Sequence, residues 1–131
     1  INIMNNLIID ATTKKMFLTL IVNKNIYTRT HENSKSNFER LIILINKLLH
    51  KNKLSFDNID TIYVNRGPGS YAGIRNSLSV VKGLFLAKQI NYYCFSFLDF
   101  DKIIENEYKD IPYLCNKFKV KKNLINPIYL S

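Results

Sequence analysis

The chain contains few of the residues on which secreted, metal-binding and membrane proteins depend. Its 131 residues include two cysteines and two histidines, and neither pair has the spacing of a metal site or a redox motif. No apolar run approaches the roughly 18 residues that span a bilayer. The first residues lack a basic segment followed by a small-residue cleavage site, so no signal peptide is expected. We therefore expect a cytoplasmic protein that holds no metal or cofactor and does not enter a membrane.

Acidic residues are also scarce, because 10 Asp and Glu face 19 Lys and Arg and leave a formal charge of +9. Such an excess is typical of proteins that bind RNA. Only four of the basic residues are Arg, however, and Lys, Asn and Ile dominate the chain. That composition is also what A/T-rich codons produce, and Lys binds phosphate less specifically than Arg. Direct contact with RNA is therefore one of two open interpretations of the charge.

Hydrophobic residues make up 47% of the chain, which is enough for a globular core. A chain of this length fits one domain and buries about two-thirds of its unfolded surface on folding. Five β-rich runs are visible, at residues 7–9, 15–22, 26–30, 61–65 and 92–97. Short turns join the first three and predict an antiparallel meander. The mostly apolar fourth run predicts a central parallel strand.

Three of the four glycines gather in one stretch, RGPGSYAGIR at residues 66–75. It lies between the fourth run and a long helical pattern, with Ser70 as candidate N-cap. The free N–H groups of a helix N-terminus can hold an anion, and the same construction can also be a rigid corner. A P-loop requires Lys after its second Gly, and a dinucleotide fingerprint is one residue shorter than this spacing. Motif spacing alone therefore favours the rigid corner.

Two long helices are predicted, at residues 36–52 and 70–88. The first begins with a capping box from Ser36 to Glu39, and its apolar face is wider than one sheet needs. The second carries a face of small side chains, which permits close approach of another helix; the alternative is a solvent-exposed face. We predict a partner interface on these helices. Its candidate residues are Phe38, Leu41, Ile43, Leu44, Ala72, Asn76, Ser79, Gly83 and Ala87.

The remainder of the chain is less regular. We expect a third helix from residue 98 to about 107 and a short strand or turn at 111–115. Residues 117–122 alternate charged and apolar groups, which predicts an edge strand or a basic arm.

The glycine stretch, extended to residues 62–75, resembles the signature of the bacterial TsaB (YeaZ) family. LIIDAT at residues 7–12 and NPIYL at 126–130 are similar to further family segments. The resemblance implies an α/β fold, a single RNase-H-like or actin-like (ASKHA) lobe with a five-stranded mixed sheet, in which the antiparallel meander precedes α-β-α-β-α. Family members have a second lobe, which we expect to be missing or vestigial at residues 101–131, so that 1–131 form one domain.

In the actin-like fold, an acidic residue at the position of Asp10 faces nucleotide phosphates or their metal. A solvated turn residue that caps local backbone is the alternative, and we favour it because Asp is a common turn former. The resemblance also makes the glycine stretch a candidate phosphate loop. The site residues that it implies are Asp10, Arg66, Gly67, Pro68, Gly69, Ser70, Gly73 and Arg75.

The family acts in making threonylcarbamoyladenosine in tRNA, as the non-catalytic partner of the related subunit TsaD. We therefore expect an accessory scaffold without chemistry of its own, which binds TsaD through helices 36–52 and 70–88. TsaE is expected near the same junction, and a homodimer when the chain is alone. The alternatives are an enzyme that binds ATP at the glycine stretch and a basic RNA-binding module, with direct tRNA contact left open.

Overall fold

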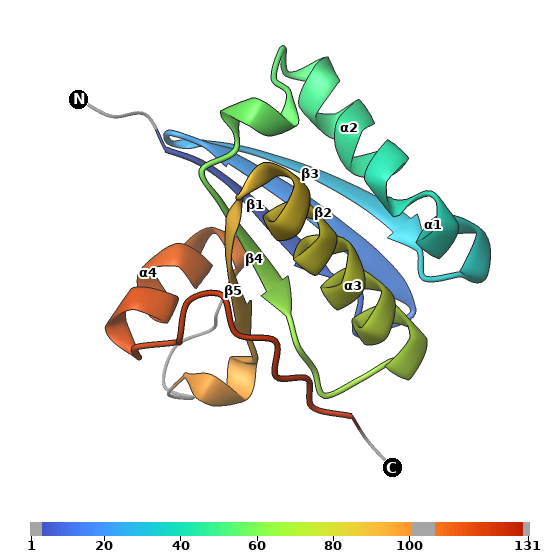
Figure 1. The fold of residues 1–131 in the computed structure, drawn as a ribbon, viewed down its shortest axis with the longest axis vertical. Helices are drawn as coiled ribbons and strands as arrows, with labels where there is room; N and C mark the ends of the chain where they lie inside the picture. Colours follow the sequence, from blue (N-terminus) through green and yellow to red (C-terminus); the bar gives the residue numbers. More distant parts are fainter. Residues whose placement is uncertain (1–3, 101–106, 130–131) are drawn as a thin grey trace.

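The computed structural model describes residues 4–100 and 107–129. A five-stranded mixed sheet runs through the molecule in the order β3-β2-β1-β4-β5 (Figure 1). Its strands are β1 (Asn5–Asp10), β2 (Lys15–Val22), β3 (Asn25–Glu32), β4 (Thr61–Asn65) and β5 (Asn91–Phe95). The predicted α/β fold, with its meander and five strands, is confirmed.

The sheet combines antiparallel and parallel strand pairing. Polar turns join β1, β2 and β3 as an antiparallel meander, and the helical crossovers place β4 parallel to β1 and β5 parallel to β4. Strands β1 and β4 are buried on both faces, which is why they read as continuous apolar runs. Strand β3, at the edge, is exposed along almost its whole length.

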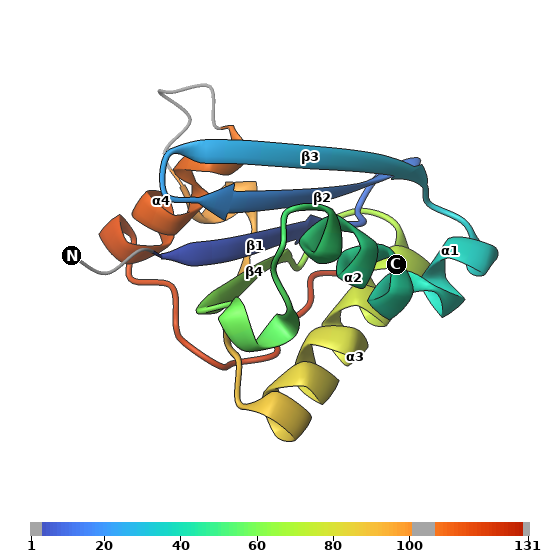
Figure 2. The same ribbon diagram turned by 90° about the horizontal axis from the view of Figure 1, so that it is seen from above.

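Helices α2 (Leu41–Lys51) and α3 (Tyr71–Lys88) lie together on one face of the sheet in both views (Figures 1 and 2). They enclose the larger core with the inward side chains of the strands, among them Leu7, Ile62 and Val64. Helix α4 (Ile111–Lys117) closes a smaller core on the opposite face, around Phe95 and Phe100. Among the described residues, α2 and α3 therefore pack against one face of the sheet, and α4 packs against the other.

The first predicted helix is divided in two. Helix α1 (Lys35–Glu39) begins at Ser34, whose side chain accepts a hydrogen bond from the Asn37 backbone N–H at 3.3 Å. The capping box predicted from Ser36 to Glu39 is therefore wrong. The helix ends at Arg40, which leaves helical geometry with φ −108°, and α2 starts at the next residue. The side chain of Asn37 donates to the Glu32 carbonyl oxygen at 2.7 Å and ties α1 to the end of β3.

The second predicted helix is confirmed as α3, with Ser70 as its N-cap accepting from the Gly73 N–H. The strand or turn predicted at residues 111–115 is wrong, because this segment is part of α4. Pro112 stands in the first turn of α4, where a missing N–H costs nothing, and the buried side chains recur at helical spacing.

The predicted third helix at 98–107 is wrong at its start, where Phe97–Asp99 forms a single 3-10 turn. The rest of it lies mostly outside the described residues. Strand β5 ends at Phe95, two residues earlier than predicted. An edge strand or basic arm was predicted at residues 117–122. In the structure Lys117 is the last residue of α4, and Lys122 makes one isolated antiparallel bridge to Tyr93.

The segment from residue 118 to 129 runs back along β5 to the glycine stretch (Figure 1). The Asn123 N–H donates to the Tyr92 carbonyl at 2.8 Å, and the Ile128 N–H donates to the Arg66 carbonyl at 2.7 Å. The NPIYL segment therefore lies against the end of β4. Within the residues that the structure describes, no helix is both long and apolar enough to cross a bilayer.

Candidate functional site

The glycine stretch is a corner pressed against neighbouring backbone. Gly67 and Gly69 have φ of 111° and 157°, which side chains rarely permit. A Cβ atom at Gly69 would collide with the Thr12 carbonyl oxygen, and one at Gly67 with the Ile128 carbonyl oxygen. The Ser70 N–H donates to the Thr12 carbonyl at 2.8 Å. These contacts fix where β4 ends and where α3 begins.

Gly73, in the first turn of α3, is equally constrained. A Cβ atom there would collide with the Ala11 carbonyl oxygen and with the Asn33 side-chain amide. The Asn33 amide itself donates to the Ala11 and Thr13 carbonyls at 2.8 and 2.7 Å. The missing side chain of Gly73 therefore lets α3 dock on the turn after β1.

Asp10, at the end of β1, is buried with 4% of its surface exposed. Its Oδ1 atom accepts from the N–H and the hydroxyl of Thr12, at 3.0 and 2.7 Å. Its Oδ2 atom accepts from the Asn65 amide at 3.1 Å and from the Tyr108 hydroxyl at 2.6 Å. The expected capping of local backbone is present, but the expected solvation is wrong, because strand β4 and the segment before α4 cover the carboxylate.

Tyr108 completes this cluster from the far end of the chain. Burial raises the pKa of its hydroxyl far above the usual range, and the adjacent Asp10 carboxylate raises the pKa further. A neutral hydroxyl is the form that donates to a carboxylate, so this pairing is self-consistent. Sequence patterns gave no signal for Tyr108, since 98 residues separate it from Asp10.

A hollow of about 360 Å³ lies beside this cluster, over the carboxyl ends of β1 and β4. Ligands of α/β sheets commonly bind at this edge. The walls are Asp10, Thr12, Thr13, Asn65, Gly67, Pro68, Ser96, Phe97, Leu98 and Tyr108, which include no cationic side chain for a phosphate. Among the described residues, no group of three or more His, Cys, Asp or Glu side chains could hold a metal ion.

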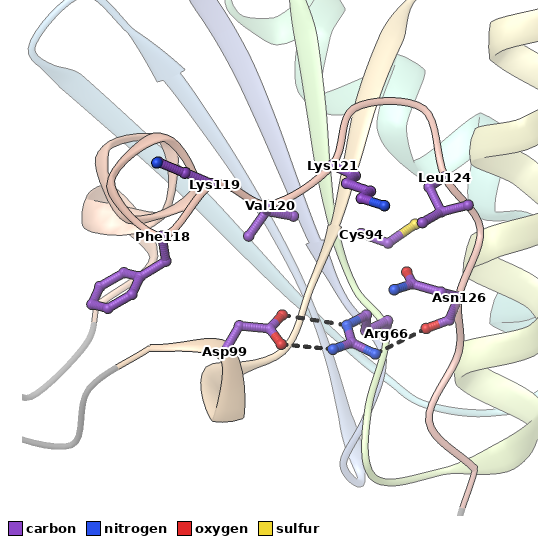
Figure 3. A pocket seen from close by; sticks show the side chains of 9 residues that line it. All are labelled: Arg66, Cys94, Asp99, Phe118, Lys119, Val120, Lys121, Leu124 and Asn126. Carbon is purple, nitrogen blue, oxygen red and sulfur yellow. Dashed lines mark hydrogen bonds and ion pairs between the residues drawn. The ribbon is translucent and has the colours of Figure 1, made fainter.

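Arg66 does not line this hollow. It lines a second one, together with Cys94, Asp99 and Asn126 (Figure 3). Its guanidinium donates twice to Asp99, with Nη2 to Oδ1 at 2.6 Å and Nε to Oδ2 at 3.3 Å. The third nitrogen donates to the Asn126 carbonyl at 3.0 Å. Arg66 therefore joins β4, the turn after β5 and the NPIYL segment, with each of its three nitrogens donating one hydrogen bond.

The other motif residues complete the corner without forming a phosphate cradle. Pro68 and Ser70 are half-buried at the junction of β4 and α3, and Arg75 is exposed on α3. The structure thus brings Asp10, Gly67 and Pro68 to one hollow and separates Arg66 and Arg75 from it. Only the tertiary contacts reveal this division, because Arg66, Gly67, Pro68 and Arg75 belong to one continuous motif.

The candidate interface residues fall into two groups. Ile43, Ala72, Ser79, Gly83 and Ala87 are exposed on α2 and α3, while Phe38 and Asn76 are half-buried. Leu41 and Leu44 are 1% and 7% exposed within the larger core, so their assignment to a partner surface is wrong. The two leucines share the buried face of α2 with Ile45 and Leu48, at helical spacing.

Two further large apolar residues that the sequence interpretation left out stand on the same helical surface. Ile42 is 43% exposed on α2, and Leu86 is 70% exposed on α3 between Gly83 and Ala87. A hollow of about 380 Å³ adjoins α2, lined by Ile42, Ile43, Asn46, Lys47, His50 and Phe56. The surplus apolar width of the first helix pointed to Ile43, which is exposed, and to Leu44, which is buried, and it did not single out Ile42.

Comparison with known proteins identifies relatives of this chain. The family model described as TsaD, tRNA N6-adenosine threonylcarbamoyltransferase, matches residues 22–106. The tRNA threonylcarbamoyladenosine biosynthesis protein TsaB of Buchnera aphidicola subsp. Baizongia pistaciae (strain Bp) is 34% identical over 65 residues. That match covers 43% of this chain and 29% of the Buchnera protein.

Among solved structures, YeaZ from Pseudomonas aeruginosa superposes with a TM-score of 0.66 at 25% identity, covering 71% of this chain and 44% of YeaZ. RuvC of T. thermophilus, solved in complex with a Holliday junction substrate, gives a TM-score of 0.52 at 12% identity, covering 73% of this chain and 66% of RuvC. The second likeness concerns the fold alone. The chain spans less than half the length of the TsaB and YeaZ relatives it matches.

Proposed function

Because the chain belongs to the family of the tRNA N6-adenosine threonylcarbamoyltransferase model, as a TsaB (YeaZ) member, we propose that it is a scaffold subunit for threonylcarbamoyladenosine synthesis. The observation that carries the proposal is the uncovered surface of α2 and α3, which we call the helical face. It consists of Ile42, Ile43, Ala72, Ser79, Gly83, Leu86 and Ala87, all exposed. In this proposal the helical face binds the catalytic subunit TsaD, with residues 1–131 acting as one lobe.

The composition of the helical face fits a partner helix. Small side chains recur along α3 at spacings of seven and four residues, at Ala72, Ser79, Gly83 and Ala87, so a second helix can approach its backbone closely. Gly83 has no atom within 4 Å of the position that its Cβ would take, which leaves room for a partner side chain. Leu86 on α3 and Ile43 on α2 are also exposed and would supply apolar area.

The large exposed side chains of the helical face would supply part of the binding free energy. Burying a large aliphatic side chain contributes about 1.5–3 kcal/mol, and Ile42, Ile43 and Leu86 are all partly exposed. Association itself costs about 4–15 kcal/mol, so the helical face needs contributions from its smaller residues as well. Exposed apolar groups that gather over two adjacent helices are a common mark of a protein interface.

The proposal assigns no catalytic step to this chain. The Asp10 carboxylate already accepts four hydrogen bonds from Thr12, Asn65 and Tyr108, so it has little capacity left for a metal or a phosphate-bound water. Three N–H groups of Arg66 donate to Asp99 and Asn126. A chain whose motif residues satisfy one another acts as a structural partner rather than as an ATPase.

The proposal also includes TsaE and tRNA as partners. TsaE would dock where this chain meets TsaD, and the charge of +9 is the support for direct contact with tRNA. A titration of the chain with tRNA at increasing salt measures that contact. Binding that persists near physiological ionic strength supports it, and binding confined to low salt contradicts it.

The proposal is tested by co-purification with TsaD from the same organism, followed by a tRNA-modification assay with and without this chain. Gly83→Leu fills the open position with a bulky side chain and should weaken the complex at least tenfold. Gly83→Ala is the matched control, because it raises helix propensity without adding bulk and should leave binding within about twofold. A complex that tolerates Gly83→Leu as well as it tolerates Gly83→Ala would remove α3 from the interface.

A further inference from the structure

Positive charge gathers at a hollow of about 210 Å³ between β3 and α2. Its lining residues are Arg29, His31, Leu44, Lys47, Leu48 and Lys51. Arg29 lies opposite Leu18 of β2, a member of the larger core, so its side chain leaves the sheet on the face that α2 covers. Lys47 and Lys51 are four residues apart and share one side of α2. Cations from a strand and from a helix therefore meet at one opening.

A fourth cation, Arg40, stands at the start of α2 and is close enough to act electrostatically on His31. We call the hollow and its cations the basic hollow. Its four cations, all exposed, are Arg29, Arg40, Lys47 and Lys51. None of them belongs to the helical face.

The nearby acidic residues do not neutralise the basic hollow. Helix α2 contains no Asp or Glu. Glu32 follows His31 along β3, so its side chain leaves the sheet on the opposite face. Glu39 ends α1 and is exposed. Among the described residues, the cations that form ion pairs are Arg66, Lys88 and Lys109. The basic hollow therefore keeps an excess of positive charge.

The imidazole of His31 responds to this charge. Burial lowers the pKa of His31, and three neighbouring cations lower it further, those of Arg40, Arg29 and Lys47. Surroundings that repel a positive imidazole are surroundings in which an anion is stabilised. An anion in the basic hollow would offset the repulsion and raise the pKa of His31.

We propose that the basic hollow binds the phosphates of an RNA segment whose bases are unpaired. Charge complementarity supports the phosphates, since the guanidinium groups of Arg29 and Arg40 match phosphate oxygens in pairs. Tyr27 supports the unpaired bases. It lies on the same face of β3 as Arg29, two residues earlier, and is 39% exposed. An exposed aromatic ring beside cations is a surface on which a base can stack. An acidic peptide would pair with the cations but would have no base to place on Tyr27.

The choice of RNA rests on the proposed function, which includes contact with tRNA, and the basic hollow gives that contact a location. Lys47 also lines the neighbouring hollow of Ile42 and Ile43, which belong to the helical face. RNA held by the basic hollow would therefore lie beside the surface proposed for TsaD.

A pair of charge-matched double variants tests the location. Arg29→Gln with Lys51→Gln removes two cations of the basic hollow, and Lys15→Gln with Lys117→Gln removes two exposed cations from the opposite face of the sheet. Binding of a labelled oligoadenylate of about twelve nucleotides is followed by fluorescence anisotropy. The first variant should bind about tenfold more weakly and lower the slope of log K against log salt by about 1.4. The second should bind within about twofold of the wild type. Equal losses in both variants would overturn the inference, because binding would then follow total charge.

Tyr27 separates stacking from charge. Tyr27→Ala should weaken binding of the oligoadenylate about tenfold and leave the salt slope unchanged, because it removes a stacking surface and no cation. Tyr27→Phe keeps the ring and should bind within about twofold of the wild type. A duplex RNA should bind both variants equally, since its bases are already stacked. Equal binding of the oligoadenylate to both variants would contradict recognition of unpaired bases.

The imidazole resonances of His31 give a readout inside the basic hollow. Saturation of the full chain with the oligoadenylate should raise the pKa of His31, followed by NMR between about pH 5 and 8. A pKa that stays unchanged would place the RNA elsewhere. A poly-glutamate peptide that binds as tightly as the oligoadenylate would overturn the choice of RNA.

All of these measurements use the chain without TsaD, and Gly83→Leu should bind the oligoadenylate as the wild type does. Loss of TsaD binding therefore leaves the result unaffected. Binding of tRNA that Arg29→Gln with Lys51→Gln retains in full would overturn the basic hollow alone. A chain that binds no RNA near physiological salt would overturn the basic hollow together with the proposed contact with tRNA.

Discussion

The hydroxyl of Tyr108 donates a hydrogen bond of 2.6 Å to Asp10, across 98 residues of sequence. This contact joins the first strand of the sheet to the segment before α4, and the Tyr108 ring also packs against Phe17 of β2 at a centroid distance of 5.7 Å. The carboxylate that would face a nucleotide in an actin-like enzyme is thereby held within the protein's own network. Its role in this chain is to fix the turn after β1, on which the glycine corner is built.

Tyr108→Phe should lower the free energy of unfolding by about 1–3 kcal/mol, because it leaves a buried carboxylate oxygen with one donor fewer. Urea denaturation measures the change. Tyr113→Phe is the matched control, since Tyr113 is 65% exposed on α4 and its removal should change stability by less than about 0.5 kcal/mol. Equal effects of the two substitutions would mean that the contact with Asp10 contributes nothing.

Two glycines of α3 should respond in opposite directions to the same substitution. Gly73→Ala forces a Cβ atom against the Ala11 carbonyl and should destabilise the protein by at least about 2 kcal/mol. Gly83→Ala meets open space and should stabilise it by about 0.5–1 kcal/mol through helix propensity. Thermal denaturation of both variants checks the pair. A shift of the same sign at both positions would contradict the close docking of α3 on the turn after β1.

The protein should lose stability at alkaline pH. Burial raises the pKa of Cys94 from 9.0 to about 11 and that of Cys115 to about 12. Between these values the unfolded chain has ionised while the folded chain keeps its protons, so stability is complete below about pH 9 and falls as pH rises. Each thiol should contribute a slope of about 1.4 kcal/mol per pH unit.

Urea midpoints measured from pH 7 to 11 test this expectation. Cys94→Ala removes one of the two thiols. The informative quantity for this variant is the slope of the unfolding free energy against pH, and not the unfolding free energy itself. The slope above pH 9 should then decrease by about one proton. Stability that stays constant up to pH 10.5 would mean that neither thiol is buried as described.

Neighbouring residues of α2 should separate folding from binding. Leu41→Ala should lower stability by about 2–5 kcal/mol, since Leu41 is 1% exposed in the larger core. Ile43→Ala should leave stability within about 0.5 kcal/mol, because Ile43 is 50% exposed, but should weaken binding to TsaD. Denaturation and a pull-down on the same preparations check both. If binding by the Ile43 variant is unchanged, α2 contributes no contact at that position.

The regular elements were predictable because their signals are local. The bounds of β2 and β4 and the N-cap of α3 at Ser70 all follow from alternation, apolar runs and capping preferences within a few residues. The prediction failed where two local signals competed. Ser34 and Ser36 are both good N-caps, and the tie between Asn37 and the end of β3 selects Ser34.

The candidate site was only partly predictable. The sequence identified the glycine stretch as a corner. It did not show why glycine is needed at Gly69 and Gly73, because the backbone that presses against them belongs to the turn after β1, some sixty residues earlier in the chain. The same limit applies to Leu41 and Leu44. Apolar periodicity showed that α2 has a wide apolar surface, and it could not show which part of that surface the sheet covers.

The sequence by itself determined the five strands, the helix after the glycine stretch and the family motif, because hydrophobic period, turn chemistry and glycine content act over short distances. The tertiary structure alone decided that Asp10 and Arg66 are engaged by Tyr108 and Asp99, and that β3 and the helical face are left uncovered. Those properties depend on which distant groups meet. A side chain's partners and exposure are set by the packed fold, and residue types along the chain do not specify them.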